Sequence, residues 1–202
     1  MLLRRFYSEK FYFFTDYINE QICKNVLKFD NIVIVYNQVS IIDLNKFLTI
    51  KNFCKSNNIK LYILDNLKIA QKFNLDGMVL SHNNYKVSYL ISANSKKNNF
   101  KIIGKAHNQK EYYFKKKQNC QNIILSSVFE NKKYKDHQLL GIIKFNLLSK
   151  NWKNNVFALG GINLVNFKKL QMTKIKGFAF NSLITNNPQI KKPVLFFRRE
   201  RV

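Results

Sequence analysis

The chain has 202 residues, of which 46% are apolar and 23% charged, a composition typical of one globular domain that needs neither disulfides nor a structural metal. Its net charge is +24, but the basic residues are spread along the whole chain, so nucleic acid is not expected as the main partner. No apolar run approaches the roughly 18 residues of a membrane helix, and residues 1–5 lack the apolar region of a signal peptide. A cytoplasmic protein without a membrane partner is therefore predicted.

Short runs of β-branched and aromatic residues alternate with longer amphipathic stretches. The first half of the chain predicts strands over 11–15, 31–36, 60–64 and 77–80, with helices over 16–28, 41–56 and 67–73. The stretch 83–98 has no clear periodicity. The second half predicts strands over 101–104, 122–125, 156–159 and 177–180, with helical stretches over 109–117, 137–148, 164–170 and after Ser182.

Strands that alternate with helices predict parallel βα units. Continuous apolar strands such as Ile32–Val35 are typical of a sheet buried on both faces. An open doubly wound sheet and a closed barrel both fit, but eight units of about 25 residues favour the barrel. We predict a single (β/α)₈ TIM barrel over 1–202, with its first strand near 11–15 and a basic tail at about 193–202.

Two local features are interpreted as structural. The run Lys115–Lys117 falls at the end of a predicted helix, where cations interact favourably with the helix dipole. Cys23, Cys54 and Cys120 lie far apart and lack the paired spacing of a disulfide framework or a zinc site. They are predicted to be reduced, partly buried thiols.

The active site of such a barrel lies at the C-terminal ends of the strands. Gly160 and Gly161 follow the seventh strand, and Ser182 follows the eighth, where a helix is predicted to begin. Small residues let backbone N–H groups approach an anion, and a helix N-terminus adds its dipole. A tight turn is the alternative explanation of the glycine pair. The pairing of the two loops favours a phosphate-binding site made by Gly160, Gly161 and Ser182.

The motifs and their order resemble the thiamine phosphate synthase/TenI family. Phe157–Asn166 is similar to the family's A-I-G-G-I-x-x-x-N, and Gly177–Ile184 is similar to its G-V-A-V-x-S-A-I. Further matches follow the same order along the chain: Phe13–Asp16, Leu75–Leu80, Ile102–Gly104, Val128–Asn131 and Leu140–Ile142. The resemblance therefore extends over about residues 11–184.

The resemblance implies a function in thiamine biosynthesis. Synthases of this family join a thiazole phosphate to a pyrimidine diphosphate and release pyrophosphate, so the implied partner is a phosphorylated small molecule. The thiazole phosphate would bind at Gly160, Gly161 and Ser182. Mg²⁺ held by two carboxylates would stabilise the leaving pyrophosphate together with basic side chains. The sequence indicates no oligomeric state.

The sequence departs from the family at the pyrophosphate end of the site. Asp65 matches the first Mg²⁺ carboxylate, but Asn84 stands at the second, so Mg²⁺ is expected to bind less well than in the family. The arginine and lysine of the family's Q-L-R-x-K fall at about 36–38, where no charged residue is present. The family's catalytic lysine matches Lys133 or Lys135. Ser127 occupies the position of the TenI histidine.

Two histidines lie near the predicted mouth of the barrel. His82 follows the fourth strand and is predicted to line the pocket. His107 follows the fifth strand, one residue short of the family's G-x-S-x-H. It is either a general base that faces the pocket, since histidine titrates near neutrality, or a loop residue at the start of a helix. His137 is interpreted as a surface residue.

Three functions remain open from the sequence. The first is a divergent thiamine phosphate synthase with weakened activity, which would use Asp65, His107 and Lys133 or Lys135. The second is a catalytically altered or inactive barrel that binds a phosphorylated small molecule. The third is a basic polyanion-binding protein, whose affinity for DNA or RNA would fall steeply with salt. The retained phosphate loops favour the first two.

Overall fold

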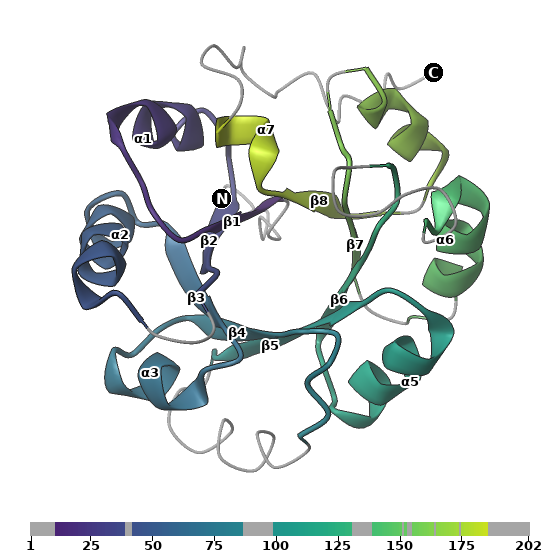
Figure 1. The fold of residues 1–202 in the computed structure, drawn as a ribbon, viewed down its shortest axis with the longest axis horizontal. Helices are drawn as coiled ribbons and strands as arrows, with labels where there is room; N and C mark the ends of the chain where they lie inside the picture. The colour runs from purple at the N-terminus through teal and green to yellow at the C-terminus, as the bar shows by residue number, and fades with distance from the viewer. Residues whose placement is uncertain are drawn as a thin grey trace, which may run out of the picture.

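Eight parallel strands, seen in a computed structural model of the chain, close into a barrel with helices around its outside (Figure 1). The structure describes residues 11–38, 42–86, 99–130, 139–150, 152, 155–163, 165–173 and 175–185. The strands are β1 (Phe11–Thr15), β2 (Ile32–Tyr36), β3 (Lys60–Leu64), β4 (Gly77–Leu80), β5 (Lys101–Ala106), β6 (Asn122–Leu125), β7 (Asn155–Leu159) and β8 (Gly177–Phe180).

Each strand pairs with the next one in the sequence, and β8 pairs with β1 through Phe11 and Phe178. This closure confirms the predicted (β/α)₈ barrel and excludes the open sheet. The one strand that is clearly longer than predicted is β5, which continues past Gly104 to Ala106. The extension matters for the site, because it places Lys105 inside the strand.

The helices are α1 (Glu20–Val26), α2 (Leu44–Ser56), α3 (Leu67–Lys72), α5 (Gln109–Lys117), α6 (Gly141–Lys150) and α7 (Ser182–Thr185), with a 3₁₀ helix, η2 (Phe167–Met172), in place of the helix predicted over 164–170. Side chains of Asn19, Asp43, Asn66 and Asn108 cap four of the helices by accepting a backbone N–H three residues later. These caps explain why α1 and α2 begin later than predicted, at Glu20 and Leu44.

The side chains of each strand alternate between the barrel interior and the layer under the helices. The interior holds Tyr12, Phe14, Val33, Val35, Tyr62, Leu64, Val79, Ile103, Ile124, Phe157 and Ala179. Aromatic rings fill much of this space: the centroids of Tyr12 and Phe157 lie 4.8 Å apart. Gly77 leaves room for the ring of Tyr62, since a Cβ there would lie 2.8 Å from that ring. Polar side chains that lie beyond these apolar residues, at the C-terminal ends of the strands, are therefore at the barrel mouth.

The cysteines agree with the prediction. Cys54 and Cys120 are buried, Cys23 is half-buried, and all three are free thiols. Burial raises the pKa of Cys54 and of Cys120 to about 12, so both stay protonated at neutral pH. Within the described residues, no helix combines the length and the apolar character that crossing a bilayer requires.

Candidate functional site

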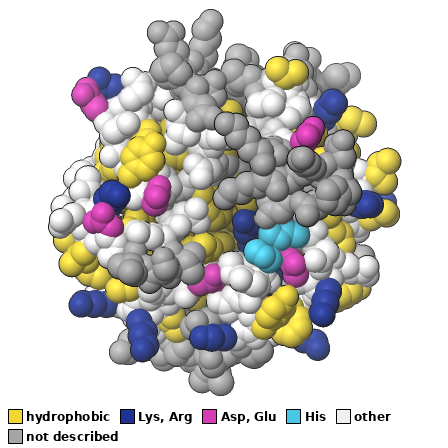
Figure 2. Space-filling model, viewed as in Figure 1, with side chains coloured by type: hydrophobic (Ala, Val, Ile, Leu, Met, Phe, Trp, Pro, Cys, Tyr) yellow, Lys and Arg dark blue, Asp and Glu magenta, His cyan; other side chains and the backbone are white. Residues whose placement is uncertain are grey.

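The face at the C-terminal ends of the strands carries most of the polar residues that the sequence singled out. Figure 2 shows this face, with the two described histidines side by side near its centre and with basic and acidic side chains next to them. His82 and Asn84 follow β4, Asp65 follows β3, and His107 follows β5. The predicted residues therefore come from three neighbouring strands. Lys133, Lys135 and His137 lie outside the described residues, as does the basic tail at 193–202.

Asp65 and Asn84, which match the family's two metal-carboxylate positions, are in direct contact. The Asp65 N–H donates to the Val79 carbonyl (2.9 Å), which extends the pairing of β3 with β4. Oδ1 of Asp65 accepts hydrogen bonds from the Ser81 N–H (2.9 Å) and from Nδ2 of Asn84 (2.6 Å). Oδ1 of Asn84 accepts from the Lys86 N–H (3.1 Å). The carboxylate thus fixes the loop after β4 to the end of β3.

The Asp65–Asn84 pair does not fit a Mg²⁺ site of the kind that the family implies. Asn84 turns its NH₂ group toward Asp65, and an amide NH₂ is a hydrogen-bond donor rather than a metal ligand. Mg²⁺ requires oxygen ligands in near-octahedral geometry. In the part of the chain that the structure describes, no group of three or more His, Cys, Asp and Glu side chains is arranged to hold a metal ion.

The two histidines pack against each other. Their ring centroids lie 4.3 Å apart, with the planes tilted by 56°. The His107 N–H donates to Oε2 of Glu111 (2.7 Å), and Nδ1 of His107 lies 3.5 Å from the same oxygen. His107 also precedes Asn108, the N-cap of α5. His107 therefore lies in the short connection between β5 and α5, one residue before the helix cap. Its role as a general base stays a prediction.

The surroundings of His107 favour its neutral form. Burial lowers its pKa to about 4, and electrostatic interactions with Lys105 and His82 act in the same direction, while Glu111 opposes them. At pH 7 His107 is consequently an uncharged imidazole, which is able to accept a proton or a hydrogen bond.

Lys105 is a site residue that the sequence analysis missed. It is paired in register with Ile124, whose side chain lies in the barrel interior, and register partners in a sheet share a face. Because Lys105 is the last residue but one of β5, its half-buried side chain points into the mouth of the barrel. The alternation from Ile103 was the signal that could have identified it.

The run Lys115–Lys117 lies in the last turn of α5, as predicted. Lys116 and Lys117 are exposed and lie over aromatic rings of α5, but Lys115 is fully buried. Its stem packs over Gly104 on the outer face of β5, and its Nζ donates to the Asn84 carbonyl (2.7 Å). Burial lowers the pKa of Lys115, while Cys120, Asp65 and Glu111 oppose this effect. The burial of Lys115 was not predicted from the sequence, because the space for its side chain is made by Gly104 of another element.

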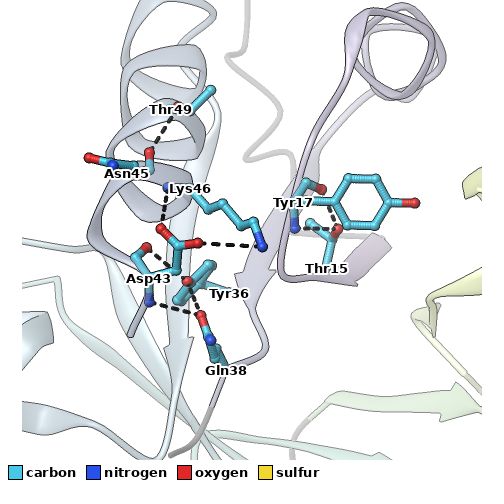
Figure 3. A network of polar contacts seen from close by, with 8 residues as sticks. All are labelled: Thr15, Tyr17, Tyr36, Gln38, Asp43, Asn45, Lys46 and Thr49. Atoms are coloured by element: carbon cyan, nitrogen blue, oxygen red, sulfur yellow. Dashed lines mark hydrogen bonds and ion pairs between the residues drawn. The ribbon is translucent and has the colours of Figure 1, made fainter. Parts of the chain in front are cut away.

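The loop after β2, where the family carries basic residues, is closed by its own hydrogen bonds (Figure 3). Oη of Tyr36 donates to Oε1 of Gln38 (2.5 Å), which also accepts from the Asp43 N–H (3.1 Å). Asp43 then caps α2 and forms an exposed ion pair with Lys46 (3.4 Å). The residues at 36–38 therefore serve the start of α2 and supply no cation to the site.

The glycine loop after β7 packs against the loop after β6. Gly160 and Gly161 have φ values of 103° and 65°, a region that L side chains rarely adopt. A Cβ on Gly160 would lie 2.9 Å from Cα of Ser127, and one on Gly161 would lie 2.5 Å from the Phe129 carbonyl oxygen. Both glycines are therefore required by local packing. Ser182 is exposed and begins α7, as predicted. Phosphate binding by these residues stays a prediction.

Comparisons with known proteins agree with this arrangement. The family model described as Thiamine monophosphate synthase matches residues 44–184. The Thiamine-phosphate synthase of Flavobacterium psychrophilum is 30% identical over 145 residues, which cover 68% of this chain and 69% of that protein. The one of Flavobacterium johnsoniae is 33% identical over 149 residues, 70% of this chain and 69% of that protein. The one of Prochlorococcus marinus is 29% identical over 78% of this chain, but over 44% of its own length.

Solved structures show the same fold. A thiamine phosphate pyrophosphorylase from Pyrococcus furiosus superposes with a TM-score of 0.69 at 19% identity, covering 86% of this chain and 85% of that one. The YdjI aldolase from Escherichia coli superposes with a TM-score of 0.60 at 9% identity, covering 87% of this chain and 76% of that one. At these identities the likeness concerns the barrel alone, because barrels host many chemistries.

Asn84→Asp should create the carboxylate pair that the chain lacks. Without a divalent cation, a second carboxylate would replace the amide donor beside Asp65, and the free energy of unfolding should fall by about 1–2 kcal/mol. Mg²⁺ should reverse this loss, because a cation that binds only the folded state stabilises it. The measurement is thermal unfolding with and without Mg²⁺, with Asn83→Asp as the control at an exposed neighbouring position. Equal stabilisation of both variants by Mg²⁺ would contradict the conclusion that residue 84 decides whether a metal binds beside Asp65.

The pKa of His107 predicts a pH dependence of stability. Because its folded-state pKa of about 4 lies below the ordinary value of 6.5, the unfolded chain binds the extra proton between these values. The neutral residue is fully accommodated above pH 6.5, and stability is lost as the pH falls toward 4. In urea unfolding, wild type should lose on the order of 1–2 kcal/mol more than His107→Gln between pH 7 and pH 5. Parallel pH profiles for the two proteins would refute the assignment.

Proposed function

The chain belongs to the thiamine monophosphate synthase family, and we propose that it acts as a divergent thiamine phosphate synthase, joining a pyrimidine diphosphate to a thiazole phosphate and releasing pyrophosphate. The observation that carries this proposal is the match of the family model described as Thiamine monophosphate synthase to residues 44–184. Asp65 and Asn84 lie within that match. These two residues match the family's metal carboxylates, and they meet at the barrel mouth with 2.6 Å between Oδ1 and Nδ2. The relatives named Thiamine-phosphate synthase support the same reaction.

The two substrates would occupy opposite sides of the mouth. The thiazole phosphate is assigned to the loops after β7 and β8, at Gly160, Gly161 and Ser182. The diphosphate is assigned to the ends of β3, β4 and β5, where Asp65, His82 and Lys105 lie. The reaction would then take place above the aromatic side chains that fill the barrel.

Loss of pyrophosphate places negative charge on the leaving group, and catalysis requires groups already in place to stabilise it. With no cation at 36–38 and no carboxylate pair for Mg²⁺, we assign this role to the ammonium group of Lys105 at the end of β5. Lys133 or Lys135 would add a second positive charge. His107, which is neutral at pH 7, would accept a proton or a hydrogen bond from the substrate.

A second candidate function is a barrel that binds a phosphorylated small molecule without this chemistry. One observation favours it: Asn84 satisfies Asp65 with an amide donor where the family has two carboxylates. The phosphate loops after β7 and β8 would be used in the same way, so a binding measurement alone does not separate the two functions. A measurement of turnover separates them.

The test is thiamine phosphate formation by the purified chain from pyrimidine diphosphate and thiazole phosphate, measured in parallel with Mg²⁺ and with EDTA. Asp65→Asn keeps the shape of the side chain and removes its charge. Because Oδ1 of Asp65 holds Ser81 and Asn84 in place, this variant should lower turnover by about tenfold or more, as expected for weakened hydrogen bonds to a charged group. Asp30→Asn, at an exposed position, should not.

Absence of turnover in folded wild-type protein, together with calorimetric binding of thiazole phosphate, would reject the synthase and support the binding function. Turnover that Asp65→Asn leaves unchanged would show that the Asp65–Asn84 pair is not the catalytic centre.

A further inference from the structure

The buried ammonium group of Lys115 requires an explanation, because burial of a charge is unfavourable unless polar groups compensate it. Lys115 is 0% exposed. Among the described residues no carboxylate lies within ion-pair distance of its Nζ, which is held by neutral oxygens: the Asn84 carbonyl at 2.7 Å and Oε1 of Gln118 at 3.0 Å. The ammonium group of Lys115 thus holds the backbone of the loop after β4, at the Asn84 carbonyl.

Gln118, the C-cap of α5, acts on the same loop. It is also fully buried, and its Nε2 donates to the carbonyls of Asn84 and Lys86, both at 3.0 Å. The Asn84 carbonyl therefore accepts from both side chains. The end of α5 is in this way fixed to the segment 84–86, which follows β4.

The strand between them is shaped to allow these contacts. Gly104 lies on the outer face of β5, and a Cβ at that position would lie 2.7 Å from Cγ and 2.8 Å from Cβ of Lys115. Any larger residue at 104 would displace the stem of Lys115. The glycine of the strand and the lysine of the helix therefore form one arrangement.

The held loop carries the candidate site. Asn84 is fixed by its carbonyl on the outer side of the barrel, while its side chain donates to Asp65 (2.6 Å) and accepts from the Lys86 N–H (3.1 Å). We propose that Lys115 and Gln118 are positioning residues that hold Asn84 against Asp65. Their effect on the loop follows from these contacts alone, whereas their effect on turnover rests on the proposed function.

The test compares Lys115→Met with Lys116→Met in the full chain. Methionine retains the apolar stem and removes the charge, and Lys116 is an exposed neighbour on the same helix. Hydrogen exchange by NMR is followed at the backbone amides of Ser81, Asn84 and Lys86, with Ile123 of β6 as the internal reference. Lys115→Met should speed exchange in the loop by about tenfold or more, the effect of losing a hydrogen bond to a charged group. Exchange at Ile123 should not change, and Lys116→Met should resemble wild type.

If Lys115→Met does not fold, Gln118→Met gives the same readout, because it removes the other donor to the Asn84 carbonyl. Loop exchange equal to wild type in a folded variant, or acceleration by the same factor at Ile123 and in the loop, would overturn the proposal and leave Lys115 as a packing residue.

Kinetics provide a second readout where wild type turns over. Lys115→Met should lower kcat by about tenfold, as expected for the loss of one hydrogen bond to a charged group. The KM for thiazole phosphate should stay unchanged, because that substrate is assigned to the loops after β7 and β8. A rise in this KM with unchanged kcat would count against positioning of Asn84. Failure of wild type to turn over would reject the synthase, while the exchange experiment would still decide the role of Lys115.

Discussion

The carboxylate of Asp65 holds the ends of β3 and β4 together, and the candidate site is arranged around it. Its Oδ1 accepts from the backbone of Ser81 and from the side chain of Asn84. Hydrogen bonds to a carboxylate are stronger than those between neutral groups. They fix the loop after β4 at the point where it leaves the barrel, and His82, which packs on His107, lies in that loop. Loss of the Asp65 charge would therefore affect the position of several site residues as well as any direct role in chemistry.

The site combines one carboxylate, that of Asp65, with lysines and neutral polar groups, where the family has two carboxylates and a metal. Lys105 points into the mouth from β5, and Lys115 holds the loop after β4 from outside the barrel. The pKa of His107 is lowered to about 4, so its imidazole is neutral at pH 7. A diphosphate carries several negative charges, and Lys105 lies where such a group would need compensation. The loop after β2, by contrast, uses Gln38 and Asp43 to begin α2. In the proposed site, the positive charge would thus come from the end of β5 rather than from the loop after β2.

Much of the fold could be predicted from the sequence, because buried parallel strands are continuous apolar runs between polar segments. The limits of α1 and α2 were less accurate, since single caps, Asn19 and Asp43, decide where the helices begin. The match of Asp65 and Asn84 to the family's metal-carboxylate positions came from the resemblance, but the orientation of the amide did not. Lys105 and Lys115 were missed for a common reason. Their positions depend on where β5 ends and on the space above Gly104, both of which are tertiary properties.

The most direct test of this account is the binding of inorganic pyrophosphate in EDTA, measured by calorimetry for wild type and Lys105→Met. Lys101→Met, at the opposite end of β5, serves as the control. We predict metal-independent binding by wild type, at least about tenfold weaker binding by Lys105→Met, as expected for a lost charge-assisted contact, and no change in the control. Pyrophosphate binding that requires Mg²⁺ would contradict the account and show that the metal compensates the negative charge. Binding that is equally strong in Lys105→Met would show that Lys105 does not contact the pyrophosphate.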